Sequence, residues 1–286
     1  MARFPGTPSA RPTDPQRAPG LSLAKIVPNV VTLLGLCAGL TAIRFGLGEQ
    51  PDFEKAAVAL IIAMVVDGVD GRIARLLNVT SRFGAELDSL SDFVCFGVVP
   101  AILLYLWTMS NAGGIGWAIV LLFVVCCGLR LARFNTSLMG EEELPPWAYN
   151  YFTGVPAPAA AGLAMLPMFL SFATDWEDFF SHPVVAGGVL IAVALLMISR
   201  IPTFSFKKTR VPKIAVLPIM VGVGVLVGLL ATAPWFTLSI AGFVYLSLIP
   251  LSFLSFRRLE RRARDHADLL PESAGDGPES GPSGHA

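Results

Sequence analysis

Eight apolar segments follow one another along the chain, and each is roughly long enough to cross about 30 Å of hydrocarbon as a helix. They lie at approximately 28–47, 54–77, 83–108, 115–137, 152–173, 183–200, 212–231 and 235–256. Hydrophobic residues make up 54% of the 286 residues and charged residues only 15%, whereas a soluble domain carries about a quarter charged residues. The sequence therefore predicts an all-α polytopic membrane protein, a bundle of about eight transmembrane helices.

The two ends of the chain differ in composition from these segments. Residues 1–20 are rich in Pro, Arg, Gly and Ser and are expected to form a disordered tail. They do not resemble a signal peptide, because no small-residue cleavage site follows the long apolar stretch behind them. A polar stretch that begins near Asp265 is expected to form a second solvated tail. Only Thr232, Ala233 and Pro234 separate the last two apolar segments, which predicts a tight helical hairpin.

The distribution of Lys and Arg predicts how the chain is oriented in the membrane. Alternate connections between the segments collect nearly all of these residues, whereas the opposite connections are mainly acidic, with Arg44 and Lys55 as their only basic residues. Since basic residues mark the cytoplasmic side and the number of segments is even, both termini are expected in the cytoplasm. The protein is expected in the inner (cytoplasmic) membrane of the cell, with membrane lipid as a partner. Its formal net charge of zero gives no support to nucleic-acid binding.

One polar motif interrupts the second and third apolar segments. It reads DGVDGRIARLLNVTSRFGAELDSLSD, and its key positions are Asp67, Asp70, Gly71, Ala74, Arg75, Ser81, Gly84, Asp88 and Asp92. At about 100° per residue, the positions before the central link share one helix face and those after it form a second stripe. Because the link is short, the two helices are expected to be antiparallel neighbours. Their stripes can then face each other and gather four carboxylates.

Four carboxylates inside a membrane repel one another and require cations nearby. Oxygen ligands select hard ions, so two divalent ions, Mg²⁺ or Mn²⁺, are expected. Two such ions suit phosphoryl chemistry, because they neutralise a diphosphate. Gly71 and Gly84 have no side chain to keep a nucleotide from the helix backbone. Arg75 offers a planar cation for phosphate oxygens, and Ser81 can donate a hydrogen bond at the same level.

The spacing D-x2-D-G-x2-A-R-x8-G-x3-D-x3-D resembles the signature of the CDP-alcohol phosphotransferase family without a gap or a substitution. The resemblance implies a six-helix catalytic core, placed here at 21–200, in a protein that is usually a homodimer. A C-terminal transmembrane hairpin would then occupy 201–256, and a basic, then disordered cytoplasmic tail would occupy 257–286. The resemblance also implies a cytidine-diphosphate site that opens to the cytoplasm.

The resemblance further implies roles for individual residues. Two metal ions would be held by Asp67, Asp70, Asp88 and Asp92. Asp92 would also be the general base that deprotonates the acceptor hydroxyl. The stretch Pro28-Asn29-Val30-Val31-Thr32 fits the family's placement of an Asn and a Thr near the nucleotide. The implied CDP-diacylglycerol-binding residues are Asn29, Thr32, Asp67, Asp70, Gly71, Arg75 and Ser81.

Two further stretches resemble the phosphatidylserine synthase branch of that family. They are Arg130-Leu-Ala-Arg133-Phe-Asn135 and Phe152-Thr-Gly-Val-Pro156-Ala-Pro158-Ala-Ala-Ala, the second with Ala157 where the branch often has Ser. This resemblance implies CDP-diacylglycerol and L-serine as substrates. An amino-acid acceptor needs a cation for its carboxylate, so Arg130 and Arg133 are candidate serine-binding residues. The alternative is that both arginines reach lipid headgroups and determine the topology.

Two other functions remain compatible with the sequence. The same chemistry could use another acceptor, such as glycerol 3-phosphate, inositol phosphate or choline, because the motif does not identify the alcohol. A cation-coupled transporter is an alternative of another class, because acids inside a membrane also line ion pathways. The Gly, Arg and Ser positions in register with the acids favour the enzyme.

Overall fold

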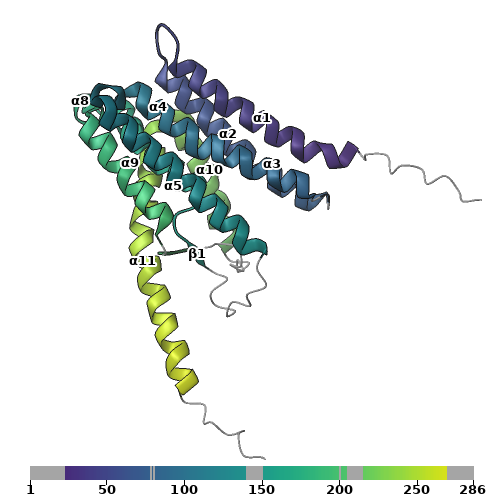
Figure 1. Cartoon of the computed structure of the whole chain (residues 1–286). Coiled ribbons are helices and arrows are strands. Elements are labelled where there is room, and N and C mark those ends of the chain that lie inside the picture. The colour runs from purple at the N-terminus through teal and green to yellow at the C-terminus, as the bar shows by residue number, and fades with distance from the viewer. Residues whose placement is uncertain are drawn as a thin grey trace, which may run out of the picture.

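The computed structural model describes residues 23–77, 79, 81–139, 151–199, 201–204 and 215–268. The predicted tail at 1–20 lies outside the described residues, and so does the end of the predicted C-terminal tail, 269–286. The described part of the chain is helical apart from one ladder of two short strands. Figure 1 shows the helices packed side by side in an elongated bundle, from which the last helix projects. The predicted all-α class is confirmed at this level.

The first two helices form an antiparallel pair, α1 (Leu23–Gly46) and α2 (Phe53–Leu76). Their bounds agree with the predicted segments 28–47 and 54–77. Asp52 caps α2, because its carboxylate accepts a hydrogen bond from the backbone N–H of Lys55 at 2.8 Å. It also pairs with the Lys55 ammonium at 2.8 Å. The side-chain hydrogen bond to Lys55 lowers the pKa of Asp52 below its usual range.

The third predicted segment, 83–108, is one continuous helical run with a change of pitch inside it. Helix α3 (Arg82–Asp92) leads into the π-helical segment η1 (Phe93–Val98), and α4 (Val99–Trp107) follows. The change of pitch begins directly after Asp92, the last aspartate of the polar motif. Short π-helical segments inside α-helices occur frequently at functional sites.

The fourth and sixth predicted segments are also helical. A 3₁₀ turn, η2 (Met109–Ala112), leads into the long helix α5 (Gly113–Met139). Helix α9 (Pro183–Ile198) follows the short helix α8 (Glu177–Phe180) and packs along α5. The Thr108 hydroxyl, just before η2, donates to the Ser181 carbonyl and ties this end of the bundle together.

The fifth predicted segment, 152–173, is not a single helix, and in this respect the prediction is wrong. Its start forms strand β1 (Tyr151–Thr153), which pairs antiparallel with β2 (Pro202–Phe204) in a register that sets Phe152 opposite Thr203. The helical part is divided into α6 (Ala157–Ala164) and α7 (Leu166–Ala173). Gly154 has a φ of 77°, and Pro156, Pro158 and Pro167 lack the backbone N–H that a continuous helix requires.

The last two helices form the predicted hairpin, α10 (Val216–Thr232) and α11 (Pro234–Asp268). Helix α11 continues to Asp268, beyond the predicted end of the eighth segment at 256. It packs against α7, where the Trp235 ring lies 5.0 Å from Phe172 and 6.0 Å from Phe169, measured between ring centroids. Every residue of α10 is exposed, so this helix lies outside the bundle.

The core joins the central helices through large apolar side chains. Phe96, Leu104, Phe123, Met168 and Leu190 are fully buried, and they come from η1, α4, α5, α7 and α9. Inside a membrane, side chains of this size stabilise the contacts between helices through close van der Waals packing. The packing therefore holds the helices that flank the polar motif in a fixed arrangement.

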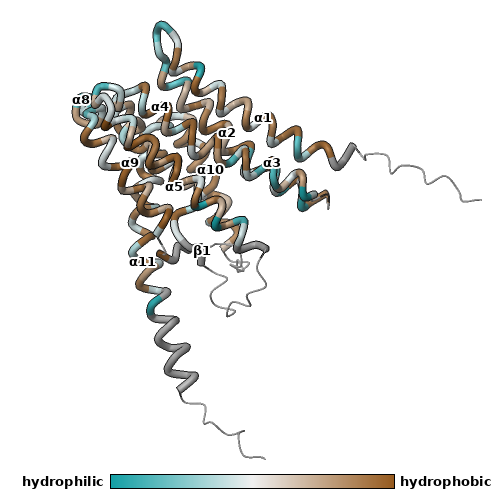
Figure 2. The backbone as a smooth tube through the Cα atoms, viewed as in Figure 1, coloured by the Kyte–Doolittle hydropathy of each residue, from teal (hydrophilic) through white to brown (hydrophobic). Residues whose placement is uncertain are grey.

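Four helical stretches of the described residues are long and apolar enough to cross a membrane. They are Ile26–Gly46, Arg82–Trp107, Met109–Thr136 and Pro234–Ser255. Helix α2 is also long, but it carries the charges of the polar motif, and α9 and α10 have 16 and 17 residues. Figure 2 shows hydrophobic residues along most of the bundle and hydrophilic ones at the α1–α2 turn and around α3.

The two ends of the bundle differ in what they contain. Figure 1 shows the α1–α2 turn and α8 at one end, and the start of α3, the end of α5 and strand β1 at the other. The first end carries acidic residues such as Asp52 and Glu177, and the second carries the polar motif with Arg75 and Arg82. The bundle therefore has a basic end, and the polar motif lies there.

Candidate active site

Three aspartates of the motif meet where α2 faces α3. Asp67 and Asp70 are three residues apart on α2, and Asp88 comes from α3. One carboxylate oxygen of each lies within 4.8 Å of the corresponding oxygens of the other two. The two stripes that the sequence predicts therefore do face each other in this part of the chain.

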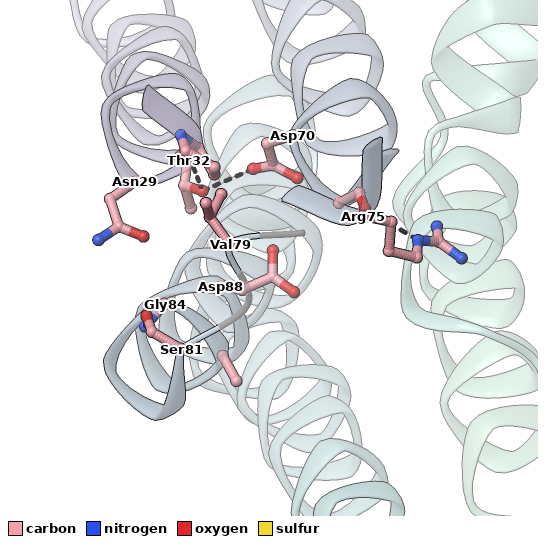
Figure 3. A pocket seen from close by; sticks show the side chains of 11 residues that line it. Asn29, Thr32, Asp70, Arg75, Val79, Ser81, Gly84 and Asp88 are labelled. Atoms are coloured by element: carbon pink, nitrogen blue, oxygen red, sulfur yellow. Dashed lines mark hydrogen bonds between the residues drawn. The ribbon is translucent and has the colours of Figure 1, made fainter. Parts of the chain in front are cut away.

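Helix α1 supports this group through a buried hydrogen bond. The Thr32 hydroxyl lies 2.7 Å from Oδ2 of Asp70 and 3.1 Å from the carbonyl of Pro28. Thr32 is 6% exposed and Asp70 only 3% exposed. A donor from α1 thus orients the Asp70 carboxylate, and Figure 3 shows this hydrogen bond between Thr32 and Asp70.

Asp92 lies next to this group rather than within it. Its carboxyl is close enough to that of Asp67 for the two to share a hydrogen bond. It also interacts electrostatically with the guanidinium of Arg130 on α5. Asp92 is the last residue of α3, and the π-helical segment begins directly after it. Asp92, the fourth acid of the motif, therefore interacts both with the carboxyl of Asp67 and with the guanidinium of Arg130.

A cavity of about 430 Å³ opens beside Asp70 and Asp88. Its walls come from α1, α2 and α3, and the sequence-predicted residues among its lining are Asn29, Thr32, Asp70, Gly71, Arg75, Ser81, Gly84 and Asp88. A methyl group built on Gly71 would meet nothing within 4 Å, so the backbone of α2 is accessible there. In Figure 3 the carboxyl groups of Asp70 and Asp88 point into the same space.

Arg75 lines the cavity but is turned along its own helix. Its Nε donates a hydrogen bond of 2.9 Å to the carbonyl of Gly71, and Figure 3 shows the guanidinium pointing away from Asp70 and Asp88. The side chain is exposed, and rotation about its side-chain bonds would carry the guanidinium toward the cavity. The structure thus brings Arg75 to the rim of the cavity and not to the aspartates.

The start of α3 is organised around Ser81. The Ser81 hydroxyl caps the helix by accepting a hydrogen bond of 3.0 Å from the backbone N–H of Gly84. A methyl group on Gly84 would lie 2.9 Å from Oδ1 of Asn29 and 3.1 Å from Oγ of Ser81. Gly84 therefore lets α1 approach α3 closely, which places Asn29 and Ser81 at the same rim.

A second cavity, of about 280 Å³, lies on the other side of Asp88. Ala85 and Asp88 line both cavities, whereas Asp92 lines only the second one. Its far wall comes from α5, where the side-chain amide of Asn135 donates a hydrogen bond of 3.0 Å to the hydroxyl of Ser89. Asp88 therefore stands between the two cavities, with Asp70 on the larger one and Asp92 on the smaller one.

The two arginines of α5 have different surroundings. Arg133 donates to the carbonyls of Ile198 and Met197 at 3.1 and 3.4 Å, and so caps the C-terminal end of α9. Arg130 is 9% exposed, and its Nε has no hydrogen-bond partner in the described part of the chain. Of the two predicted serine-binding residues, the structure brings Arg130 toward Asp92 and ties Arg133 to α9.

The carboxylate group fits a divalent cation. Separations up to 4.8 Å between the three oxygens are close to twice the roughly 2.0–2.6 Å that separates Mg²⁺ or Ca²⁺ from its ligand oxygens. All three ligands are hard oxygen donors, which favours such ions over thiophilic metals. The four described cysteines (Cys37, Cys95, Cys126 and Cys127) are free thiols and belong to no such group.

Several contacts of the site were not predicted from the sequence. The hydrogen bond between Ser89 and Asn135 joins α3 to α5, although Asn135 ended a stretch already singled out. Tyr245 of α11 interacts electrostatically with Arg130. Polar residues in otherwise apolar helices were the available signal, but nothing in their spacing indicated which helices would meet.

Comparison with known families tests the resemblance that the motif suggested. The sequence model of the CDP-alcohol phosphatidyltransferase family matches residues 25–199, which include all four aspartates and both arginines of α5. The chain belongs to the CDP-alcohol phosphatidyltransferase family. A second model, described as CDP-alcohol phosphatidyltransferase 2, matches residues 215–250, in α10 and α11. The family assignment thus rests on more than the motif.

Curated relatives within this family carry one name. The chain is 38% identical over 250 residues to the CDP-diacylglycerol–serine O-phosphatidyltransferase of Mycobacterium tuberculosis, an alignment that covers 86% of this chain and 84% of the relative. Its identity to the Helicobacter pylori protein of the same name is 36% over 185 residues, covering 65% and 74% of the two chains. The Bacillus subtilis protein of that name is 32% identical over 182 residues, covering 64% and 92%.

Proposed function

We propose that this protein transfers the phosphatidyl group of CDP-diacylglycerol to L-serine, giving phosphatidylserine and CMP. The observation that carries the proposal is the group of three carboxylates, one of which, Asp88, lines both cavities, in a chain of this family. Such an arrangement can hold a diphosphate on one side and an acceptor alcohol on the other. The shared name of the relatives favours serine as the acceptor.

Two divalent ions, Mg²⁺ or Mn²⁺, are proposed to be held by Asp67, Asp70, Asp88 and Asp92. When bound, these ions would supply positive charge to the diphosphate and to the leaving phosphate. The Thr32 hydroxyl contributes by orienting Asp70. Asp67 and Asp92 favour metal binding because they are neighbours. A cation between two adjoining carboxylates relieves the repulsion of their charges.

The larger cavity is the proposed site of the CDP group. Its lining comes from three helices, and the backbone of α2 is accessible at Gly71. Asn29 and Ser81 stand at one rim and offer polar atoms to the nucleotide, and Arg75 stands at another. Once its guanidinium turns from the Gly71 carbonyl to the phosphates, Arg75 pairs with them. The acyl chains remain in the lipid beside the bundle.

The smaller cavity is the proposed site of the acceptor. Asp92 faces it and takes the proton of the serine hydroxyl. The serine oxygen forms a bond to the β-phosphorus, and the bond from that phosphorus to the bridging oxygen breaks. CMP leaves with the electron pair of that bond. Asp88, which lines both cavities, stands between donor and acceptor.

Arg130 is the better placed of the two candidate ligands for the serine carboxylate. It does not itself line the smaller cavity, but its neighbour Leu131 does. It is buried and interacts electrostatically with Asp92, and its Nε has no hydrogen-bond partner among the described residues. Arg133 already donates to two carbonyls of α9. We therefore assign the direct contact with serine to Arg130. Arg133 holds the end of α9 beside α5 and does not contact serine itself.

The membrane arrangement belongs to the same proposal. Eight spans are proposed, with a six-helix core at 21–200, the hairpin at 201–256, and tails at 1–20 and 257–286. Support comes from the position of the polar motif at the basic end of the bundle, which is the cytoplasmic side for most membrane proteins. The protein is proposed to lie in the inner membrane as a homodimer, with both termini and the site in the cytoplasm.

The decisive experiment measures CMP release from CDP-diacylglycerol by the purified protein with serine and a divalent ion. Asp92→Asn is expected to abolish turnover while the protein still elutes as a folded species. Asp175→Asn, the same change at an exposed residue of the opposite end, is the matched control and is expected to leave the rate unchanged. Wild-type turnover in Asp92→Asn would refute the role of Asp92 as base.

An acceptor panel in the same assay identifies the alcohol. CMP release with glycerol 3-phosphate, inositol phosphate or choline, and none with serine, would assign the protein to another branch of the family. Ion flux across sealed vesicles without cleavage of the CDP-lipid would indicate a transporter instead.

A further inference from the structure

Buried polar atoms without partners lie behind the carboxylates. Among the described residues, Nε of Arg130 and the hydroxyls of Tyr245 and Ser252 are buried and have no hydrogen-bond partner. Such atoms are rare in folded proteins, because a buried donor that lacks an acceptor loses its bond to water without replacement. Ser252 lies about two turns along α11 from Tyr245. The other two atoms belong to residues that interact with each other.

Arg130 is near both Asp92 and Tyr245. Its guanidinium interacts electrostatically with both of these residues and lies 5.8 Å from the centroid of the Phe134 ring. The side chain is nine-tenths buried, at 9% exposure. Two buried donors, from α5 and α11, thus belong to residues that interact with each other, and one of the two also interacts with the proposed base.

The depth of these residues in the bundle agrees with this placement. Asp92 lies ten residues from the start of the span Arg82–Trp107, and Tyr245 lies ten residues from the end of Pro234–Ser255. The start of α3 lies at the basic end of the bundle, and α11 runs toward that end (Figure 1). At about 1.5 Å per residue, Asp92 and Tyr245 each lie about 15 Å along their helices from those span ends.

From these observations we infer that Tyr245 is a specificity-determining residue for the acceptor. Its hydroxyl and Nε of Arg130 donate hydrogen bonds to the carboxylate of the acceptor amino acid, and each donor takes one carboxylate oxygen. This inference rests on the proposed function, since it deepens the description of the same site. It explains why these two buried donors have no partner among the residues that the structure describes.

The chemistry of the two donors selects for a carboxylate. A carboxylate offers two oxygens and a negative charge that is attracted by the Arg130 guanidinium. An alcohol that lacks this group leaves both donors unpaired inside the protein, and sites built to bond a polar group reject analogues without it. Tyr245 lies outside residues 25–199, the range that the family model matches. Helix α11 therefore contributes to acceptor specificity although it follows that range in the chain.

The test compares two acceptors that differ only in the carboxylate. L-Serine and serinol (2-amino-1,3-propanediol) share the amine and a hydroxyl, but serinol has a second CH₂OH in place of the carboxylate. In Tyr245→Phe, KM for serine is expected to rise at least roughly tenfold, the effect of losing one hydrogen bond to a charged group. Its kcat with serine and its kinetics with serinol are expected to stay within about twofold of wild type.

Tyr105→Phe is the matched control. Tyr105 loses the same oxygen atom in this variant, but it lies on α4 with its ring against Trp117, at 5.1 Å between centroids. Its kinetics with both acceptors are expected to equal those of wild type. Gel filtration of all three proteins shows whether each one is folded.

Each remaining outcome decides against the inference. Unchanged serine KM in Tyr245→Phe, or equal losses with serine and serinol, would overturn the role of Tyr245 and leave the proposed function intact. Wild-type protein that releases no CMP with serine would overturn the proposed function and the inference together. If Tyr245→Phe does not fold, competition in wild type decides, because L-alanine should inhibit and L-alaninol should not; equal inhibition by both would overturn the inference.

Discussion

Gly154 offers a direct test of how the helices around the site are held together. This residue follows strand β1 and has a φ of 77°, in the left-handed region. Its N–H bonds to the carbonyl of Ile201 at 2.9 Å. A methyl group on Gly154 would lie 2.5 Å from the carbonyl oxygen of Met197 and 2.9 Å from that of Ser199. Both the conformation and the space require glycine.

The cost of Gly154→Ala can be estimated from these two effects. A residue with a Cβ in the left-handed region costs roughly 1–2 kcal/mol. The methyl group would also contact two backbone oxygens, which cannot move aside as a flexible side chain could. We therefore expect the free energy of unfolding to fall by about 3 kcal/mol in total, within the range for backbone strain and overpacking. For a protein of this size, that loss corresponds to a fall of about 6–12 °C in Tm. The end of α9 that Arg133 contacts would shift as well.

Thermal unfolding of the purified protein in detergent measures this loss. Gly162→Ala is the matched control, because Gly162 lies inside α6 and a methyl group there would meet only Cε of Met64, at 4.0 Å. That variant is expected to keep or raise Tm, since alanine favours a helix over glycine by up to about 1 kcal/mol. A Tm for Gly154→Ala within about 1 °C of the control would refute the reasoning.

Three further predictions concern the two cavities. Gly71→Ala should leave Tm unchanged, because the added methyl group meets nothing in the free protein. It should raise KM for CDP-diacylglycerol, since the methyl group projects into the larger cavity. An unchanged KM would contradict the assignment of that cavity to the nucleotide. Ser81→Ala should destabilise the protein by about 1 kcal/mol through loss of the helix cap, seen as a lower Tm, and a Tm equal to wild type would show that the cap is not needed. Asp88→Asn should lower kcat/KM by more than the roughly 10–100-fold that is typical of residues that only support a metal ligand. EDTA should abolish CMP release by the wild-type protein until Mg²⁺ or Mn²⁺ is added. Turnover that persists in EDTA would exclude a metal requirement.

The helices that the sequence predicted well are those with long, unbroken apolar stretches. The bounds of α1 and α2 differ from the predicted segments by a few residues at most, and the hairpin of α10 and α11 turns at Ala233 as expected. The polar motif also predicted that α2 and α3 would face each other, because helical periodicity places its acids on single faces. Local composition is sufficient for inferences of this kind.

The fifth segment shows where composition was insufficient. Its residues are apolar enough for a helix, but the pairing of Phe152 with Thr203 uses a partner about fifty residues further along the chain. Gly154 and the prolines indicated a break, and only the ladder with β2 explains where the chain goes instead. Strand pairing between distant segments depends on how the helices between them pack, which hydropathy does not record.

What the sequence determined by itself is the environment of the chain and the kind of chemistry it can support. Long apolar segments require a membrane. The acids at helical spacing, among them Asp70 and Asp88, repel one another and are stabilised as carboxylates when cations lie between them. Only the tertiary structure decided which side chains surround those acids. Thr32 of α1 bonds to Asp70, and Asn135 of α5 bonds to Ser89, whereas Tyr245 of α11 interacts with Arg130. Side-chain packing, rather than any local pattern, sets these contacts between helices.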